Sequence, residues 1–233
     1  MRTCGHTVPV LAIAHRTPRT AGGCRRLTAL GVSVFEVDLQ FLAGAPVVSH
    51  FLPLLPALPR LRHDRWRFTV RARAAAEEDL AAVIARVPAG SALLVDLKSE
   101  DPASAAVLVD LLGASGRPPA GWYVSAKAPA ALAVVAAAGY RTWLSIAARP
   151  AFAAALVGRL PGGRDRLPTG LDAVTVRHTY LDRATVGRLR EQVPRVMAWT
   201  VGDVRRAAEL AAAGVAGLTS DSAEVHAYAA AQR

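Results

Sequence analysis

Lysine is almost missing from this sequence of 233 residues. Lysine and arginine together number 28, and only Lys98 and Lys127 are lysines, so 28 minus 2 leaves 26 arginines. The arginines are scattered along the chain, and aromatic residues make up only 6% of it. Proteins that bind nucleic acids instead gather cations into dense patches, with aromatic side chains that stack on bases. The net charge of +10 therefore does not indicate a nucleic-acid partner.

Cysteine and long apolar runs are also scarce. Cys4 and Cys24 are the only cysteines, and their spacing suits neither a metal site nor a disulfide framework, so we expect two reduced thiols. No apolar run approaches the roughly 20 residues of a membrane-spanning helix. Residues 1–14 also lack the basic start and long apolar centre of a signal peptide. These absences predict a cytoplasmic protein without an integral membrane segment.

Apolar residues are abundant overall, at 52% of the chain. A chain of this length and content can bury one large core, and α/β barrels commonly reach this size as a single unit. We therefore predict one domain over residues 1–233.

Short apolar segments alternate with alanine-rich helical segments along the chain. Strands are predicted at residues 9–14, 34–39, 92–97, 122–125, 142–146, 173–176, 195–200 and 217–219. Helices are predicted at residues 24–30, 75–87, 102–112, 129–138, 150–157, 182–191, 203–213 and 222–231, with the acids at 77–79 in the first turn of the second helix. Eight strand–helix units are the number in a TIM (β/α)8 barrel. An open doubly wound sheet is the alternative, but no glycine-rich phosphate loop follows any strand.

Residues 33–50 combine acids and a histidine in one short stretch. Glu36 and Asp38 alternate with apolar residues, and the strand's period of two places both acids on one face. Adjacent like charges need either water or a cation such as a divalent metal between them. Solvated acids on an edge strand are the alternative, but the apolar surroundings are typical of a buried parallel strand. After a turn at 43–45, an extended run at 46–48 leads to His50, which we expect beside the acid pair.

The segment after His50 differs in composition. Residues 51–73 are rich in proline and arginine, show no clear period and are predicted to form a loop. His63 and Asp64 lie within it, and His63 is an alternative second histidine at the site. His6 and His226 are expected at the surface.

A barrel places its active site at the carboxyl ends of its strands. The polar residues at those predicted ends are His15, Arg16, Glu36, Asp38, Asp96, Lys98, Ser125, Lys127, Ser145, Arg177, His178, Trp199, Ser220 and Asp221.

Three kinds of chemistry meet in this set. Glu36, Asp38 and Asp96 can ligate one hard divalent cation through oxygen. His15 and His50 can act as a general acid and base on either side of a scissile bond. Cations at Arg16 and Lys98 can hold an anionic group such as a phosphate. Together these groups predict phosphodiester cleavage.

The same motifs, in the same order, resemble the glycerophosphodiester phosphodiesterase family, a group of phospholipase C-like TIM barrels. The resemblance spans nearly the whole chain. It rests on Ala-His-Arg at 14–16, Glu-Val-Asp at 36–38, Pro-Val-Val-Ser-His at 46–50, Asp-Leu-Lys at 96–98, Ala-Trp-Thr at 198–200 and Gly-Leu-Thr-Ser-Asp at 217–221.

The resemblance implies an enzyme of glycerol and lipid metabolism that hydrolyses glycerophosphodiesters to glycerol 3-phosphate and an alcohol, with Ca²⁺ or Mg²⁺ as cofactor. It further implies that a glycerol hydroxyl attacks the phosphorus and that water opens the resulting cyclic phosphate. The implied roles are metal binding by Glu36, Asp38 and Asp96, proton exchange by His15 and His50, neutralisation of the phosphoryl charge by Arg16 and Lys98, and a wall for the glycerol from Trp199.

The sequence departs from the family's pattern at several positions. Thr17 stands where glycine usually follows His-Arg, and residues 18–20 keep only a trace of the Glu-Asn-Thr motif. Phe51 follows His50 where aspartate is usual. The third metal carboxylate is Asp96, whereas the family usually has glutamate.

These departures leave two alternatives to the hydrolase. The Asp-x-Lys form at 96–98 resembles the spider-toxin type phospholipases, so a phospholipase D-like enzyme that acts on lysophospholipids is one alternative. A catalytically degenerate barrel that binds a phosphorylated ligand is the other.

Two interpretations of Lys127 stay open. It is either a compact positive charge that the site needs or a solvated cation in a loop.

Overall fold

The computed structural model describes residues 9–42, 44–49, 78–146 and 167–232. The prediction of a single domain over residues 1–233 extends beyond these ranges and stays a prediction. The predicted loop at 51–73, His63 within it and the predicted helix at 150–157 lie outside the described residues.

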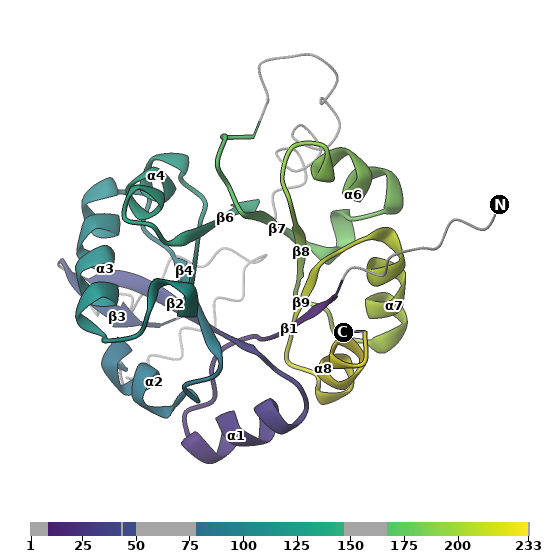
Figure 1. Cartoon of the computed structure of the whole chain (residues 1–233), viewed down its shortest axis with the longest axis horizontal. Coiled ribbons are helices and arrows are strands. Elements are labelled where there is room, and N and C mark those ends of the chain that lie inside the picture. The colour runs from purple at the N-terminus through teal and green to yellow at the C-terminus, as the bar shows by residue number, and fades with distance from the viewer. Residues whose placement is uncertain (1–8, 43, 50–77, 147–166, 233) are drawn as a thin grey trace, which may run out of the picture.

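Among the described residues, eight parallel strands form a closed barrel, which confirms the predicted TIM (β/α)8 fold and excludes the open sheet (Figure 1). The barrel closes because β1 pairs in parallel with both β2 and β9. The strands are β1 (Leu11–Ala14), β2 (Val34–Leu42), β4 (Ala92–Leu97), β5 (Trp122–Ala126), β6 (Arg141–Ile146), β7 (Ala173–Arg177), β8 (Val196–Trp199) and β9 (Gly217–Ser220).

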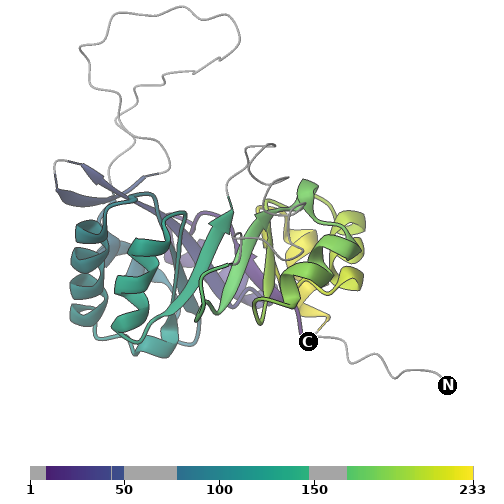
Figure 2. The same cartoon turned by 90° about the horizontal axis from the view of Figure 1, so that it is seen from above.

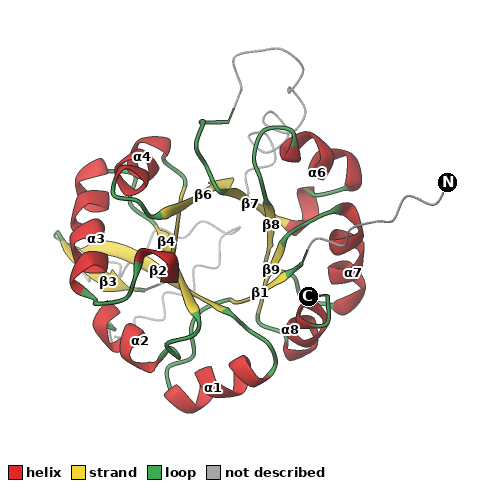
Figure 3. Cartoon of the chain, in the orientation of Figure 1, coloured by secondary structure: helices red, strands yellow, loops and turns green. Residues whose placement is uncertain are grey.

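The helices surround the barrel on its outer side, as Figure 3 shows. Most begin at a Ser, Thr or Asp whose side chain accepts a hydrogen bond from a backbone N–H of the first turn, the usual N-cap arrangement. They are α1 (Ala21–Ala29), α2 (Leu80–Arg86), α3 (Pro102–Ala114), α4 (Pro129–Ala137), α6 (Arg183–Arg190), α7 (Val204–Ala213) and α8 (Ala223–Ala230), with short 3₁₀ turns at Pro119–Gly121 and His178–Tyr180. Within the described ranges, no helix is both long enough and apolar enough to cross a membrane.

Helix α2 begins later than predicted, so its acids do not occupy its first turn. Asp79 is the N-cap, and its side chain accepts a hydrogen bond from Ala81 N at 3.1 Å. Glu78 lies before the helix, where it makes a two-pronged ion pair with Arg86. Arg86 also donates from Nε to the carbonyl of Pro18 at 2.6 Å. Arg86, the last residue of α2, therefore links the segment before this helix to the loop after β1.

A hairpin extends the second barrel strand. β3 (Ala45–Val48) pairs antiparallel with the outer half of β2, in the register Leu39 to Val48. Figure 2 shows this hairpin projecting beyond the carboxyl ends of the neighbouring strands. The extended run predicted at 46–48 is therefore confirmed and begins at Ala45, whereas Ala43 of the predicted turn lies outside the described residues.

The inner face of the barrel changes from apolar to polar along each strand. A compact group of buried apolar side chains fills the amino-terminal half of the barrel interior. Two positions further along, on the same face, the side chains are polar or aromatic and line a pocket. The pairs are Ile13 and His15, Val34 and Glu36, Leu94 and Asp96, Tyr123 and Ser125, Trp143 and Ser145, Ala173 and Thr175, and Met197 and Trp199.

Candidate active site

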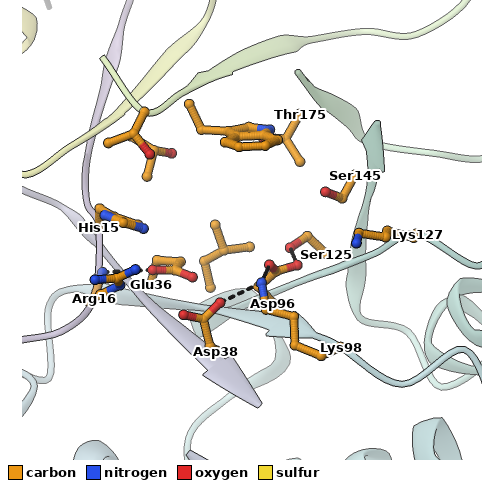
Figure 4. A pocket seen from close by; sticks show the side chains of 14 residues that line it. His15, Arg16, Glu36, Asp38, Asp96, Lys98, Ser125, Lys127, Ser145 and Thr175 are labelled. Atoms are coloured by element: carbon orange, nitrogen blue, oxygen red, sulfur yellow. Dashed lines mark hydrogen bonds and ion pairs between the residues drawn. The ribbon is translucent and has the colours of Figure 1, made fainter. Parts of the chain in front are cut away.

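One pocket of about 370 Å³ opens at the carboxyl ends of the strands (Figure 4). This volume lies in the usual range for a small-molecule site. Seven of the eight predicted site residues line it: His15, Arg16, Glu36, Asp38, Asp96, Lys98 and Trp199. The other predicted rim residues in its lining are Ser125, Lys127 and Ser145, and the structure adds Leu94, Thr175, Thr200 and Thr219. The remaining predicted rim residues are not part of the lining: Arg177, His178, Ser220 and Asp221.

The three predicted metal carboxylates converge. One oxygen from each of Glu36, Asp38 and Asp96 lies within 4.8 Å of the others, and Glu36 and Asp38 are each only 5% exposed. Asp38 and Asp96 are direct neighbours in the β2–β4 register. Because β2 lies between β1 and β4 inside the barrel, the alternative of solvated acids on an edge strand is wrong. Three oxygen donors at this spacing fit a hard divalent cation.

Lys98 lies between two of these acids. Its ammonium group makes ion pairs with Asp38 Oδ1 at 2.5 Å and with Asp96 Oδ2. Burial opposes the charge on Lys98, but the nearby carboxylates of Asp96 and Asp38 outweigh it and raise the pKa of Lys98. The lysine therefore remains a cation and neutralises part of the acid cluster. The second carboxylate oxygen of Asp96, Oδ1, accepts a hydrogen bond from the Ser125 hydroxyl at 2.7 Å.

The remaining repulsion within the cluster acts on the pKa of Glu36. Burial and the charge of Asp38 raise the pKa of Glu36 from its ordinary value of 4.5 to about 8, although a hydrogen bond from Arg16 N and the charge of Lys98 act in the opposite direction. In the metal-free protein, the cluster thus holds a proton at neutral pH. A divalent cation can displace that proton, because it supplies the missing positive charge.

The loop after β1 positions Glu36 through its backbone. Arg16 adopts a left-handed conformation with φ 57°, which few non-glycine residues do outside functional sites. In this conformation Arg16 N donates to Glu36 Oε2 at 2.7 Å. Thr17 donates to the carbonyl of Glu36 from both N, at 2.7 Å, and Oγ1, at 2.9 Å. The hydroxyl contact is one that glycine, usual at this position in the family that the sequence resembles, could not make.

His15 is held by an aspartate from the far end of the chain. Asp221 receives a hydrogen bond from His15 Nδ1, at 2.9 Å to Oδ2 and 3.0 Å to Oδ1. Because an ionised carboxylate can only accept, this contact requires a proton on Nδ1, and the basic nitrogen of that tautomer is Nε2. Asp221 was predicted at the rim without a role. The structure gives it one, because its hydrogen bond orients the imidazole of the predicted catalytic histidine.

His226 supports the strand end that carries Asp221, and its prediction as a surface residue is wrong. It is only 1% exposed, because α8 packs its buried face against the barrel. Its Nε2–H donates to the carbonyl of Ser220 at 3.0 Å. Burial lowers the pKa of His226, which favours this neutral, donating form.

His50 lies outside the described residues, so its predicted place beside the acids is untested. The residue before it is well held, since Ser49 N donates to the carbonyl of Asp38 at 3.0 Å. The carbonyl of Ser49 accepts a hydrogen bond from Gln40 Nε2 at 2.7 Å. The chain thus runs alongside the acid pair as far as Ser49.

No protein-family model matches the sequence, and comparison with curated proteins also finds no match. Solved structures, in contrast, match over almost the whole chain. A phosphodiesterase from Oleispira antarctica, in complex with the product sn-glycerol-3-phosphate, is 17% identical with a TM-score of 0.66, covering 96% of this chain and 97% of its own. A glycerophosphodiester phosphodiesterase from Parabacteroides distasonis is 16% identical with a TM-score of 0.64, covering 97% and 99%.

An enzyme of different chemistry shares the same architecture. The orotidine 5′-phosphate decarboxylase from Pyrococcus horikoshii is 10% identical with a TM-score of 0.55, covering 95% of this chain and 98% of its own. At these identities the likeness shows the fold alone. The function therefore has to be argued from the residues of the pocket.

The raised pKa of Glu36 predicts a specific pH dependence of stability. Between pH 4.5 and 8 the folded protein holds a proton that the unfolded chain releases, so the free energy of unfolding falls as pH rises through this window. The slope contributed by this group is at most about 1.4 kcal/mol per pH unit. Below pH 4.5 both states are protonated and the group contributes no slope.

Urea unfolding of the metal-free wild type and of Glu36→Gln, measured from pH 5 to 8, checks this prediction. We expect the wild type to lose stability relative to the glutamine variant as pH rises. Parallel stability curves for the two proteins would contradict it.

Proposed function

We propose that this chain is a metal-dependent phosphodiester hydrolase that cleaves glycerophosphodiesters to glycerol 3-phosphate and an alcohol. The observation that carries the proposal is one pocket in which three converging carboxylates, a lysine between them and an aspartate-held histidine face the same space. Two phosphodiesterases with this fold support it, one of them in complex with sn-glycerol-3-phosphate.

Glu36, Asp38 and Asp96 would hold one divalent cation, Ca²⁺ or Mg²⁺. The cluster suits such an ion because its donors are all oxygens and because burial and the charge of Asp38 raise the pKa of Glu36. When bound, the cation polarises phosphoryl oxygens and offsets the negative charge that develops on them. The net charge of the three acids, Lys98 and a divalent cation would then be zero.

The histidines would exchange protons with the reacting groups. With Nδ1 hydrogen-bonded to Asp221, neutral His15 can accept a proton at Nε2, and protonated His15 can return it. In the proposal, a glycerol hydroxyl loses its proton as its oxygen attacks the phosphorus, and the departing alcohol gains one. His15 and His50 carry these two protons and exchange roles when water opens the cyclic phosphate.

The remaining predicted residues would bind the substrate. Arg16 is exposed at the pocket and can hold a phosphoryl oxygen through its guanidinium group. Lys98 would add a second positive charge next to the metal site. The half-buried indole of Trp199 lines the pocket and offers an apolar wall for the carbon side of glycerol.

A coupled assay for glycerol 3-phosphate tests this function. With glycerophosphocholine as substrate, we expect release that requires added Ca²⁺ or Mg²⁺ and stops when the ion is chelated. His15→Ala should lower kcat by about 10²- to 10⁴-fold, the usual contribution of a general acid or base. Lysophosphatidylcholine, assayed in parallel for release of choline, tests the phospholipase D-like alternative. No metal-dependent release from either substrate would leave the degenerate, ligand-binding barrel as the better account.

The Asp221 contact predicts a positioning effect on the same reaction. Asp221→Ala leaves the imidazole in place but frees its orientation and tautomer, so we expect kcat to fall about tenfold with little change in KM. Asp221→Glu should recover part of the loss, because it keeps the carboxylate. Asp110→Ala, which removes an exposed carboxylate from α3, is the matched control. Equal kcat values for Asp221→Ala and the control would show that His15 needs no such partner.

A further inference from the structure

Both lysines of this chain lie in the same pocket. Lys98 is paired with two carboxylates. Lys127 directly follows β5, is exposed and lines the pocket. Figure 4 shows its amino group directed into the pocket, on the side opposite His15. In a chain that otherwise uses arginine, two lysines in one pocket indicate that a compact point charge is required there.

Two hydroxyl groups lie on the same wall as Lys127. Ser145 on β6 and Thr175 on β7 are direct neighbours in the strand register, and both line the pocket. Among the described residues, no hydrogen bond or ion pair engages the side chains of Lys127, Ser145 or Thr175. Ser125 differs from them, because its hydroxyl already donates to Asp96. One cation and two hydroxyl donors are therefore open to a ligand on this wall.

The charge of the pocket exceeds what a simple phosphodiester needs. Lys98 and a divalent cation balance the three carboxylates, which leaves Arg16 and Lys127 as uncompensated cations among the described lining residues. A phosphodiester carries a single negative charge and balances only one of them. The other cation favours a second anionic group and disfavours a cationic one such as choline.

We propose that Lys127, with Ser145 and Thr175, forms a subsite for an acidic group on the alcohol part of the substrate. Glycerol itself carries no acidic group, so the recognised carboxylate or phosphate belongs to the alcohol that is released. The inference rests on the proposed function and adds to it a preference, among glycerophosphodiesters, for those whose alcohol carries a carboxylate or a phosphate.

Two matched substrate pairs test the subsite. Glycerophosphoserine differs from glycerophosphoethanolamine by one carboxylate, and glycerophosphoinositol 4-phosphate differs from glycerophosphoinositol by one phosphate. We expect kcat/KM to favour the acidic member of at least one pair by about fivefold, the size of a partly exposed charge contact. The pair that shows the preference identifies the acidic group as a carboxylate or a phosphate.

Variants at Lys127 separate this subsite from other roles. Lys127→Gln should abolish the preference while changing kcat/KM, for the member of each pair that lacks the extra acidic group, less than about twofold. Lys127→Arg should keep the preference, and Ser145→Ala should weaken it about twofold. No preference in either pair, or a preference that survives Lys127→Gln, overturns the proposal. An equal loss for all four substrates also overturns it, because Lys127 would then hold the reacting phosphate.

Failure of the proposed function is visible separately, as no hydrolysis of any of the four diesters. In that case calorimetry with the same four compounds and Ca²⁺, on wild type and Lys127→Gln, decides the subsite by affinity. Tighter binding of an acidic member that is lost in Lys127→Gln supports it. Equal affinities within both pairs overturn it.

Discussion

The mutual repulsion of Glu36, Asp38 and Asp96 is the constraint on which the site depends. Their oxygens lie within 4.8 Å of one another, and two of the three side chains are almost completely buried. A fold can keep such a cluster only if positive charge or protons compensate it. Lys98 supplies part of this positive charge, and a proton on Glu36 supplies another part. The cluster can therefore exchange that proton for a cation.

The barrel makes this arrangement possible by separating packing from chemistry along each strand. The amino-terminal half of the interior is a plug of buried apolar side chains, with Trp143 and Met197 fully buried. Two residues further along the same face, the strands present the pocket. The acids therefore sit on a rigid apolar floor, and their spacing is set by the β2–β4 register and not by flexible loops.

The period of two and the order of the strand ends were readable from the sequence, so the barrel and most of the pocket could be predicted. Contacts that depend on closure of the barrel could not. Asp221 meets His15 only because β9 returns to pair with β1, across 206 residues of sequence. The backbone N–H of Arg16 donates to Glu36 because Arg16 adopts a left-handed conformation. No residue pattern predicts this conformation at a position that is not glycine. Helix α2 begins later than predicted because Glu78 pairs with Arg86 and does not join the helix.

Calorimetric titration of the metal-free protein with Ca²⁺ and with Mg²⁺ tests the central claim, that the three carboxylates form a cation site, most directly. The account predicts one saturable ion per chain, proton release on binding near pH 7 because Glu36 must lose its proton, and loss of binding in Asp38→Asn. An unchanged titration in Asp38→Asn, or no saturable binding of either ion by the wild type, would contradict it.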